Sequence, residues 1–341
     1  MGGAQLMTRR PTSFDIAARA GVSQPTVSRA LSGSPSVRDA TRARVFAAAA
    51  ELNYKVDKNA SGLRRQQSRT LAVLFFDEEV PEGAVLNPFY LSLLGPMVRH
   101  CAECGYDLLI SIQQLSSDWH LDYEDSRKAD GIILLGYGDY TQYRPKLEKL
   151  IERGAHFVRW GSGDSNEIGT TVSSDNEAGG FEATSHLLGR GFRKIAFIGT
   201  AEAGYPEFRR RWEGYCRALR TAVIEPDDRL QVEAGPSESE GRAALEQLLE
   251  RGVEFDAIFA SSDVAAIGAM HALQAIGRKV AVVGFDDIPA ASLSSPPLTT
   301  VTQDPRQAAE ALIDTLIEGV EGGSAPNRVL PVRLTIRQSS S

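Results

Sequence analysis

Cysteine is scarce in this chain, and long apolar runs are missing. Cys101, Cys104 and Cys216 are the three cysteines among 341 residues, too few for the disulfide framework of a small secreted domain. No run of about 18 apolar residues occurs, so we expect no membrane-spanning helix. The opening stretch MGGAQLMTRRPTS also lacks the apolar segment of a secretory signal. These absences predict a cytoplasmic protein.

Motifs of the common enzyme and cofactor sites are missing too. No serine stands in a GxSxG turn. The segment GTAEAG at residues 199–204 lacks the glycine patterns that bind dinucleotides or nucleoside triphosphates. The five histidines are scattered without metal-ligand spacing: His100, His120, His156, His186 and His271. We therefore expect no catalytic activity, no cofactor and no metal.

One CxxC pair, Cys101 and Cys104, stands beside His100. No second pair and no thioredoxin-like context accompany it. The two cysteines are three residues apart on an expected helix that also carries Leu93 and Met97. We interpret both as packing residues rather than as redox or zinc ligands.

Charge is distributed unevenly along the chain. The formal net charge is −7, but residues 1–70 hold 12 Lys and Arg against 4 Asp and Glu. The remaining residues hold 25 basic against 40 acidic side chains. A basic head on an acidic body suggests that the head meets a polyanion such as nucleic acid.

The basic head has the pattern of three short helices. The first follows Ser13 and ends at Gly21, which suits a left-handed helix terminus. A second helix is expected from Gln24 to about Ser32, with Ser23 as its N-cap and Pro25 in its first turn. A third, alanine-rich helix is expected over residues 38–53. Two short helices joined by a tight turn with glycine form a helix-turn-helix, whose second helix enters the major groove of DNA.

The second helix carries the side chains that such a contact needs. Its apolar positions Val27, Ala30 and Leu31 fall on one face and leave the polar residues elsewhere. Hydroxyl groups near a helix N-terminus suit phosphate contacts, whereas glutamine and arginine can read adenine and guanine. The residues expected to contact DNA on this segment are Ser23, Gln24, Pro25, Thr26, Ser28 and Arg29.

From residue 71 onward, short apolar runs alternate with helix-length segments. The runs include TLAVLFF, DGIILL, RKIAFIG, FDAIFAS and AVVGF. This alternation predicts a doubly wound α/β body, which could form two lobes.

The head resembles the amino-terminal domain of the lactose-repressor (LacI/GalR) family of bacterial transcription regulators. The resemblance rests on DIAARAGVSQPTVSRALSG, VRDATRARVFAAAAELNY and NASGLRR. The body resembles the periplasmic-binding-protein-like effector domain of the same family through NPFY, DNEAGG, RRWEGY, ASSDVAAIGAM, VGFDD and PPLTTVTQD. The implied fold class is α/β, with an N-terminal three-helix helix-turn-helix domain and a hinge before a two-lobed effector domain.

This resemblance implies domain boundaries. The DNA-binding domain would cover residues 12–56, the hinge 57–70, and the effector-binding and dimerisation domain 71–341. Lobe one would hold about residues 71–166 and 301–326, and lobe two about 167–300 and 327–341. Within the head, the family pattern assigns base reading to Gln24, Pro25 and Arg29; proline can at most touch a thymine methyl group.

The hinge of the family folds on the operator and inserts a leucine into the minor groove, which by register is Leu63. Such wedges kink DNA at a cost of about a few kcal/mol per unstacked step. Ser61 stands where arginine is common, and Gly62 weakens a helix by roughly 1 kcal/mol relative to alanine. A plain flexible linker is the alternative interpretation of this segment.

Ligands of open α/β sheets bind beyond the carboxyl ends of the strands, and the family resemblance places five residues there. Phe89 and Trp160 are expected as stacking surfaces for a sugar ring. Arg211 and Asp286 are expected to hydrogen-bond to its hydroxyl groups. Asp263 could bind the effector or could merely cap the helix that it begins. The stretch AIGRKVAVVGFDD is shorter than the family pattern before Val282, through either a true deletion or missing residues.

Together these features predict a homodimeric, nucleoid-associated regulator, a repressor of carbohydrate-utilisation genes. Its partners would be a pseudo-palindromic double-stranded DNA operator and a small sugar-like effector, a mono- or disaccharide, bound between the lobes. The body alone also permits a solute-binding protein or a cleft-based enzyme; the missing export signal and the missing motifs argue against each. The identity of the sugar, the operator and the direction of the response stay open.

Overall fold

The computed structural model describes residues 11–31, 33–54, 68–77, 86–114, 123, 128–136, 140–164, 167–201 and 204–341. The chain divides into two compact units, Met1–Gln67 and Ser68–Ser341. Within these described ranges, no helix combines the length and apolarity that crossing a membrane requires.

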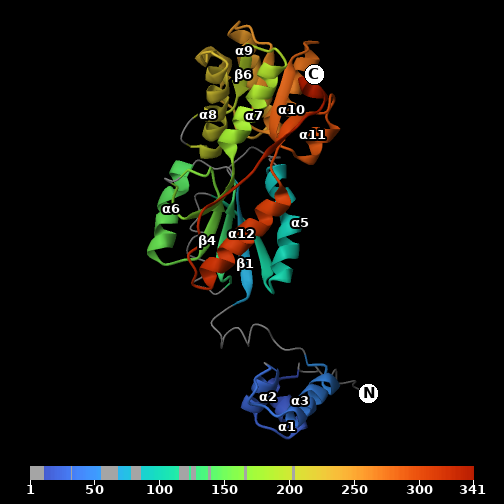
Figure 1. Ribbon diagram of the computed structural model, residues 1–341. Coiled ribbons are helices and arrows are strands. Elements are labelled where there is room, and N and C mark those ends of the chain that lie inside the picture. The colour runs from blue at the N-terminus through green and yellow to red at the C-terminus, as the bar shows by residue number, and fades with distance from the viewer. Residues whose placement is uncertain are drawn as a thin grey trace, which may run out of the picture. The chain divides into compact units, whose positions relative to one another are not determined.

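The first unit contains the expected helix-turn-helix (Figure 1). Its helices are α1 (Ser13–Ala20), α2 (Gln24–Leu31) and α3 (Asp39–Glu51). Helix α1 begins after Thr12, whose backbone N–H donates to Asp15 Oδ2 at 2.7 Å, and it ends at Gly21 with φ 66°. The predicted left-handed terminus is therefore confirmed. The predicted third helix was one residue too long at its start and two at its end, because the final turn unwinds after Glu51.

The three helices enclose a small core of their own. Ile16, Val27 and Val45 are fully buried and meet Ala30 and Ala48. Small residues on α2 and α3 let three short helices pack closely, so the polar residues of α2 face outward.

The second unit is built on two six-stranded sheets. The first sheet has the order β11-β5-β4-β3-β1-β2 and the second the order β12-β10-β9-β8-β6-β7. All neighbouring strands are parallel except the antiparallel pair β10–β12. The strands of the first sheet are β1 (Thr70–Asp77), β2 (Asp107–Gln114), β3 (Gly131–Leu135), β4 (Phe157–Trp160), β5 (Thr170–Ser174) and β11 (Arg328–Leu330). Those of the second sheet are β6 (Ile195–Ile198), β7 (Gln231–Val232), β8 (Ala257–Ala260), β9 (Ala281–Asp286), β10 (Thr299–Thr302) and β12 (Arg333–Thr335).

Helices flank both sheets, as Figure 1 shows. The first sheet carries α5 (Pro88–Glu103), α6 (Tyr140–Glu152) and α12 (Pro305–Val320). The second carries α7 (Asn176–Gly189), α8 (Pro206–Thr221), α9 (Glu238–Glu250), α10 (Asp263–Ala275) and α11 (Pro289–Leu293). Central strands such as β3, β8 and β9 are buried along their whole length, which explains the continuous apolar runs in the sequence. We call each sheet with its helices a lobe.

The chain passes between the lobes three times, but not where the family resemblance placed the boundaries. Strand β5 pairs with β4 through Trp160 and Val172, so the first lobe extends to Ser174 rather than to residue 166. Strand β10 pairs with β9 up to Thr302, so the return to the first lobe follows that residue. Strand β11 pairs with β5 up to Leu330, which moves the last passage from residue 326 to 330. Edge-strand pairing, invisible in a linear sequence, decides these limits.

The connection between α10 and β9, which is shorter than in the family pattern, covers residues 276–280. Gly277 lies within it at φ 65°. Five residues are an ordinary link between a helix and a strand, and Asp286 ends β9 at the edge where β8 and β10 also end.

Candidate functional site

Helix α2 presents its polar side chains at the surface of the first unit. Val27 and Ala30 are buried, as predicted. Of the residues expected to contact DNA, Ser23, Pro25 and Arg29 are exposed, and Gln24, Thr26 and Ser28 are half-buried. The expected division into an inner apolar and an outer polar face is therefore confirmed.

Hydroxyl and amide groups gather at the start of α2. The Ser23 and Thr26 hydroxyl oxygens lie 2.8 Å apart. The Ser23 carbonyl accepts from the Thr26 N–H at 2.9 Å. Gln24 Nε2 donates to Ser13 Oγ at 3.3 Å, which holds its amide across the turn. The positive end of the helix dipole at such a start favours anionic partners.

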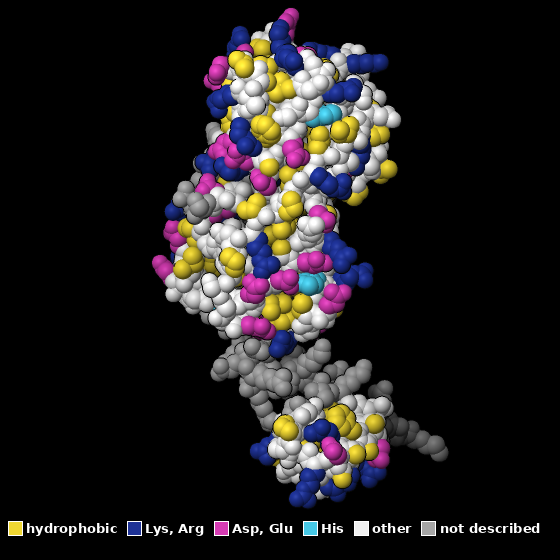
Figure 2. Space-filling view, viewed as in Figure 1, with side chains coloured by type: hydrophobic (Ala, Val, Ile, Leu, Met, Phe, Trp, Pro, Cys, Tyr) yellow, Lys and Arg dark blue, Asp and Glu magenta, His cyan; other side chains and the backbone are white. Residues whose placement is uncertain are grey.

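Basic side chains gather along the left and lower margins of the visible face of this unit (Figure 2). Arg19 pairs with Glu51 at 2.7 Å, and Arg42 donates to the Ser34 carbonyl at 2.8 Å. Arg19 thus links α1 to α3, and Arg42 links α3 to the segment that precedes it, whereas Arg29 lies exposed on α2. The surface suits a phosphate backbone.

Leu63, the expected minor-groove wedge, lies outside the described residues, as does most of the expected hinge. The second unit begins at Ser68. There the Asp130 carboxylate accepts from the Ser68 N–H at 2.5 Å and from the Arg69 N–H at 2.8 Å. The body therefore holds the chain two residues before the expected end of the hinge.

Arg211 on α8 is the centre of a buried polar network in the second lobe. Its side chain is completely buried. Its Nε donates to Asn176 Oδ1 at 2.8 Å, and its Nη1 donates to the Ser261 carbonyl. The guanidinium lies 3.7 Å from the centre of the Phe285 ring. Two hydrogen bonds and one ring contact therefore hold the Arg211 guanidinium in a fixed position.

Asp286, the last residue of β9, lies beside that guanidinium. Its Oδ1 is 3.6 Å from Arg211 Nη1 and accepts from Gln303 Nε2 at 2.6 Å. Burial raises the pKa of Asp286 to about 7, although Arg211 and Gln303 act to lower it. The backbone at Asp286 has φ 119°, a conformation rare outside glycine and frequent at functional sites.

Asp263 was expected either to bind the effector or to cap α10, and in the structure its carboxylate bonds to two other segments of the second lobe. Ser262, not Asp263, caps α10 by accepting from the Ala265 N–H at 3.2 Å. Asp263 Oδ1 accepts from Thr300 Oγ1 at 2.5 Å and Oδ2 from the Ile288 N–H at 2.9 Å. Both carboxylate oxygens therefore fasten the segment after Asp286 to β10. Burial is the main reason why the pKa of Asp263 is raised.

Phe89 and Trp160 meet in the first lobe. Their ring centres are 5.4 Å apart at an angle of 54°, and both side chains are buried. Phe89 lies in the first turn of α5, which Asn87 caps by accepting from the Phe89 N–H at 2.8 Å. The two rings therefore form one apolar wall at the carboxyl end of β4.

Several buried polar atoms among the described residues lack a hydrogen-bond partner, and five of them lie at the same edge of the two sheets. These five are Asn87 Nδ2, Trp160 Nε1, Ser261 Oγ, Asp286 Oδ2 and Gln303 Oε1. Burying a polar atom without a partner costs about 1–3 kcal/mol. These atoms lie at or after the carboxyl ends of strands, where an open α/β sheet binds its ligand.

Four polar residues at this junction were not among the expected site residues: Asn176, Glu167, Glu207 and Gln303. Arg159 Nη2 pairs with Glu167 Oε1 at 3.0 Å, both buried. Glu207 lies in the first turn of α8, and burial raises its pKa to about 7. The arginine inside the apolar run HFVRW, and the glutamine directly after β10, were the available signs in the sequence.

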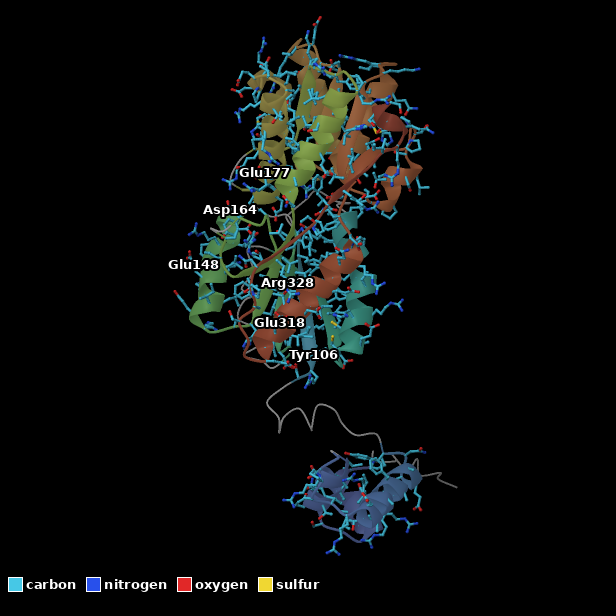
Figure 3. The ribbon with its side chains drawn as sticks, in the orientation of Figure 1. Tyr106, Glu148, Asp164, Glu177, Glu318 and Arg328 are labelled. Atoms are coloured by element: carbon cyan, nitrogen blue, oxygen red, sulfur yellow. The ribbon has the colours of Figure 1, made fainter. Side chains whose placement is uncertain are left out.

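Two contacts join the lobes, and one of them involves Asp164, which lies at the end of the first lobe nearest the second (Figure 3). Arg209 on α8 pairs with Asp164, which follows β4 in the first lobe, at 2.8 Å. The Tyr140 N–H on α6 donates to the Gly204 carbonyl at 2.9 Å. Lobe orientation and the polar network are therefore physically connected.

Both units match known proteins. The model of the bacterial regulatory proteins of the lacI family matches residues 14–57, and that of a periplasmic binding protein-like domain matches residues 184–340. The HTH-type transcriptional regulator CelR of Thermobifida fusca is 32% identical, over 97% of this chain and 98% of that protein.

Solved structures agree. The structure of the CelR–cellobiose complex has a TM-score of 0.72 and 31% identity, covering 97% of this chain and all of that one. The lac repressor dimer bound to operator and the anti-inducer ONPF has a TM-score of 0.80 and 25% identity, covering 97% and 99%. The expectation of a regulator rather than an enzyme is thereby confirmed. The chain belongs to the lacI family of bacterial regulatory proteins and is a DNA-binding transcriptional regulator.

Proposed function

We propose that this protein is a homodimeric repressor of carbohydrate-utilisation genes whose grip on its operator is controlled by a small sugar bound between the lobes. It works on the nucleoid in the cytoplasm. The observation that carries the effector half of the proposal is the set of buried, unpartnered polar atoms at the strand ends of both lobes. Sugar hydroxyl groups are donors and acceptors that would satisfy them.

The chemistry of this site favours a saccharide over an apolar ligand. Arg211 and Asp286 supply charge-assisted hydrogen bonds, each contributing about 1.5–3 kcal/mol. Phe89 and Trp160 supply apolar ring surface. Asp263 supports the site indirectly, because it fastens the backbone after Asp286. The relative CelR has been solved with cellobiose, which makes a β-linked glucose disaccharide the first ligand to test.

In the DNA-binding half, Gln24 and Arg29 read bases while Ser23, Thr26 and Ser28 contact phosphate. Pro25 touches a thymine methyl group at most, and Leu63 wedges the central base step. One small head buries too little DNA for specificity, so two heads related by a dyad read a pseudo-palindrome.

Control by the effector follows from the contacts between the lobes. A sugar that bonds to Trp160 on the first lobe and Asp286 on the second changes how the lobes sit about the Arg209–Asp164 pair. That change moves the first lobe of each copy, where the body begins at Ser68. The spacing of the two hinges then decides whether both Leu63 side chains reach the minor groove together.

Operator binding is tested by selecting a site from random duplex DNA and titrating it by fluorescence anisotropy. Arg29→Ala is expected to weaken binding by about 1–3 kcal/mol and to relax the preference at one base pair of each half-site. Arg144→Ala on α6, an exposed arginine of the body, is the matched control and should bind as the parent does. Failure to enrich any palindrome would refute the DNA-binding half of the proposal.

Effector binding is tested by calorimetry with cellobiose, glucose and other mono- and disaccharides. Asp286→Asn keeps the shape of the site but removes its charge, so we expect at least about tenfold weaker binding of the active sugar. Repeating the DNA titration with that sugar gives the direction: weaker operator binding identifies an inducer, and tighter binding a corepressor. Absence of heat with every sugar would refute the effector half alone.

A further inference from the structure

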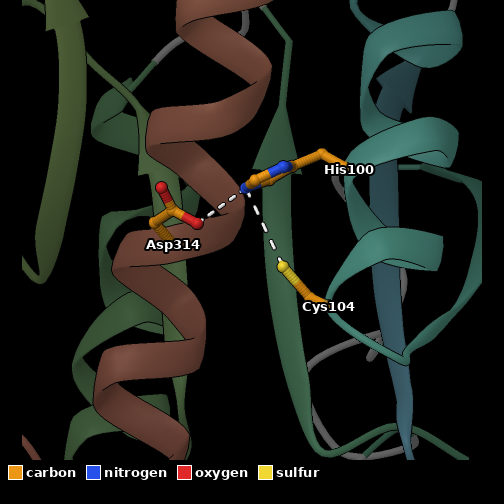
Figure 4. Close-up of side chains that lie close together, drawn as sticks. All are labelled: His100, Cys104 and Asp314. Atoms are coloured by element: carbon orange, nitrogen blue, oxygen red, sulfur yellow. Dashed lines mark hydrogen bonds and ion pairs between the residues drawn. The ribbon is translucent and has the colours of Figure 1, made fainter.

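Three metal-ligating side chains from the segments of α5 and α12 come together on the first lobe (Figure 4). They lie away from the carboxyl ends of the strands, where the proposed sugar site is. His100 lies in the last turn of α5, Cys104 is the C-cap residue directly after that helix, and Asp314 lies on α12. The distance from His100 Nε2 to Asp314 Oδ1 is 2.7 Å, and that to Cys104 Sγ is 3.9 Å. The three ligand atoms all lie within 4.8 Å of one another.

These side chains are the ligand types that zinc prefers. Zn²⁺ binds thiolate sulfur at about 2.3 Å and imidazole nitrogen and carboxylate oxygen at about 2.0–2.2 Å. In a tetrahedral site this places the sulfur and nitrogen atoms about 3.5 Å apart, and the nitrogen and oxygen atoms about 3.4 Å. The two separations from His100 Nε2 differ from these by about 0.4–0.7 Å, an adjustment of the size that side-chain rotation supplies.

The surroundings of His100 also suit a metal ligand. Its other ring nitrogen, Nδ1, lies 3.5 Å from Glu103 Oε2. Histidine that ligates a metal through one nitrogen commonly bonds a carboxylate through the other, which fixes the ring orientation. Glu310 on α12 is a further acidic neighbour of His100. The group is half-buried, so an ion can enter and a water can occupy a fourth position.

The two cysteines of the CxxC pair are thereby separated in role. Cys101 is 1% exposed and lies in the core of the first lobe, as the sequence predicted. Cys104, only half-buried, also packs against that core, as predicted, and its Sγ lies 3.9 Å from His100 Nε2. The zinc motif dismissed for want of a second cysteine pair is completed from α12, more than 200 residues later in the chain.

We propose that His100, Cys104 and Asp314 form a zinc site that ties α5 to α12, with Glu103 as the residue that positions His100. This site is independent of the proposed sugar site and of DNA binding. Bound zinc would stabilise the folded first lobe, because the unfolded chain does not hold the three ligands together.

The full chain, without an affinity tag, reduced and freed of metal by a chelator, is titrated with Co²⁺ and then with Zn²⁺. We expect one equivalent of Co²⁺ to produce a thiolate-to-metal charge-transfer absorption in the near ultraviolet, and Zn²⁺ to displace it. Zinc should also raise the thermal unfolding midpoint. Loss of an outer carboxylate typically costs 10–100-fold in metal affinity, so Glu103→Gln should weaken Zn²⁺ binding by about tenfold or more.

Cys104→Ser should abolish the charge-transfer absorption, and Asp314→Asn should weaken Zn²⁺ binding by at least about as much as Glu103→Gln. The matched control is His271→Gln, because His271 Nδ1 and Glu238 form another histidine–carboxylate pair between two helices, at 2.7 Å. That variant should bind Zn²⁺ as the parent does. All variants are checked by circular dichroism without metal.

Two results would overturn the zinc site. One is the absence of a charge-transfer absorption after addition of one equivalent of Co²⁺. The other is a folded Cys104→Ser variant that binds Zn²⁺ as tightly as the parent does. Either would mean that the three side chains form only a hydrogen-bonded contact between helices.

Discussion

At the scale of single residues, the costliest feature is the charge buried at the junction of the lobes. Arg159 and Arg211 are at most 1% exposed, and Glu207 and Asp286 at most 4%. Burying charges is favourable only where partners and hydrogen bonds compensate for lost water. Here part of the compensation is missing, since Asp286 Oδ2 has no partner within the described part of the chain. A buried carboxylate oxygen without a hydrogen-bond partner is typical of a site that binds a polar ligand.

The acid groups of this junction make stability depend on pH. Burial raises the pKa of Glu207 from 4.5 to about 7, with Glu167 adding to the shift. Between these values the folded protein holds a proton that the unfolded chain has released. The free energy of unfolding should therefore fall as pH rises from about 5 to 7, by at most about 1.4 kcal/mol per pH unit for this group. Asp286 acts in the same direction.

Urea unfolding between pH 5 and 8 measures this slope. Glu207→Gln should flatten it and should make the protein more stable than the parent at pH 8, because a neutral amide replaces a buried carboxylate. Glu148→Gln, on the exposed face of α6, should leave the slope unchanged. An identical slope in the parent and Glu207→Gln would show that Glu207 titrates normally.

At the scale of elements, glycines bring the helices of the second lobe into backbone contact. A Cβ atom at Gly180 on α7 would lie 2.1 Å from the Arg211 carbonyl oxygen. One at Gly214 on α8 would lie 2.1 Å from the Glu177 carbonyl oxygen. At each glycine, the absence of a side chain lets the backbone of the other helix approach closely. This close packing fixes the position of Arg211 relative to the carboxyl ends of the strands.

Gly214→Ala should push α7 and α8 apart. We expect a loss of about 1–3 kcal/mol in the free energy of unfolding, the usual cost of overpacking, together with weaker sugar binding because Arg211 moves. Gly189→Ala, at the end of α7 where a Cβ atom meets nothing within 4 Å, should instead stabilise the protein by about 0.5–1 kcal/mol. Urea unfolding and calorimetry measure both effects. Equal stabilities of the two variants would contradict the close packing of α7 and α8.

At the scale of the whole molecule, the first lobe leaves an apolar surface on α5 and on β2, which is an edge strand. Val98 on α5 is 51% exposed, and Ile110 and Ile112, which share one face of β2, are 45% and 58% exposed. Exposed apolar residues on an edge strand and on a helix of the same lobe are typical of an interface. It is the surface that we expect to pair two copies.

Ile112→Asp should therefore convert the dimer into monomers at micromolar concentration. In a two-fold symmetric interface both copies carry the substitution, so two charges would be buried. Operator affinity should fall with it, since one head alone binds weakly. Ile151→Asp places the same change on α6, where Ile151 is 52% exposed outside the patch, and should leave the dimer intact. Sedimentation velocity distinguishes the outcomes, and a dimeric Ile112→Asp variant would move the interface elsewhere.

Local patterns were sufficient for much of the fold. The helix-turn-helix, its glycine terminus and the outward face of α2 follow from side-chain periodicity and capping, which act within a few residues. The alternation of apolar runs and helices likewise predicted two-sided burial of parallel strands. At the proposed sugar site, the sequence placed Trp160 and Asp286 at strand ends, but it did not reveal the contacts of Asp263, Glu207 and Gln303.

The sequence by itself determined that a basic, three-helix head precedes an α/β body, because the spacing of apolar residues and the distribution of charge can be read directly from the order of residues. Only the tertiary structure decided which distant residues meet: Arg211 with Asp286, Asp263 with Thr300, and His100 with Asp314. Strand pairing also moved the lobe limits to Ser174, Thr302 and Leu330. Contacts between residues far apart in the chain depend on how whole elements pack, and no local pattern encodes that packing.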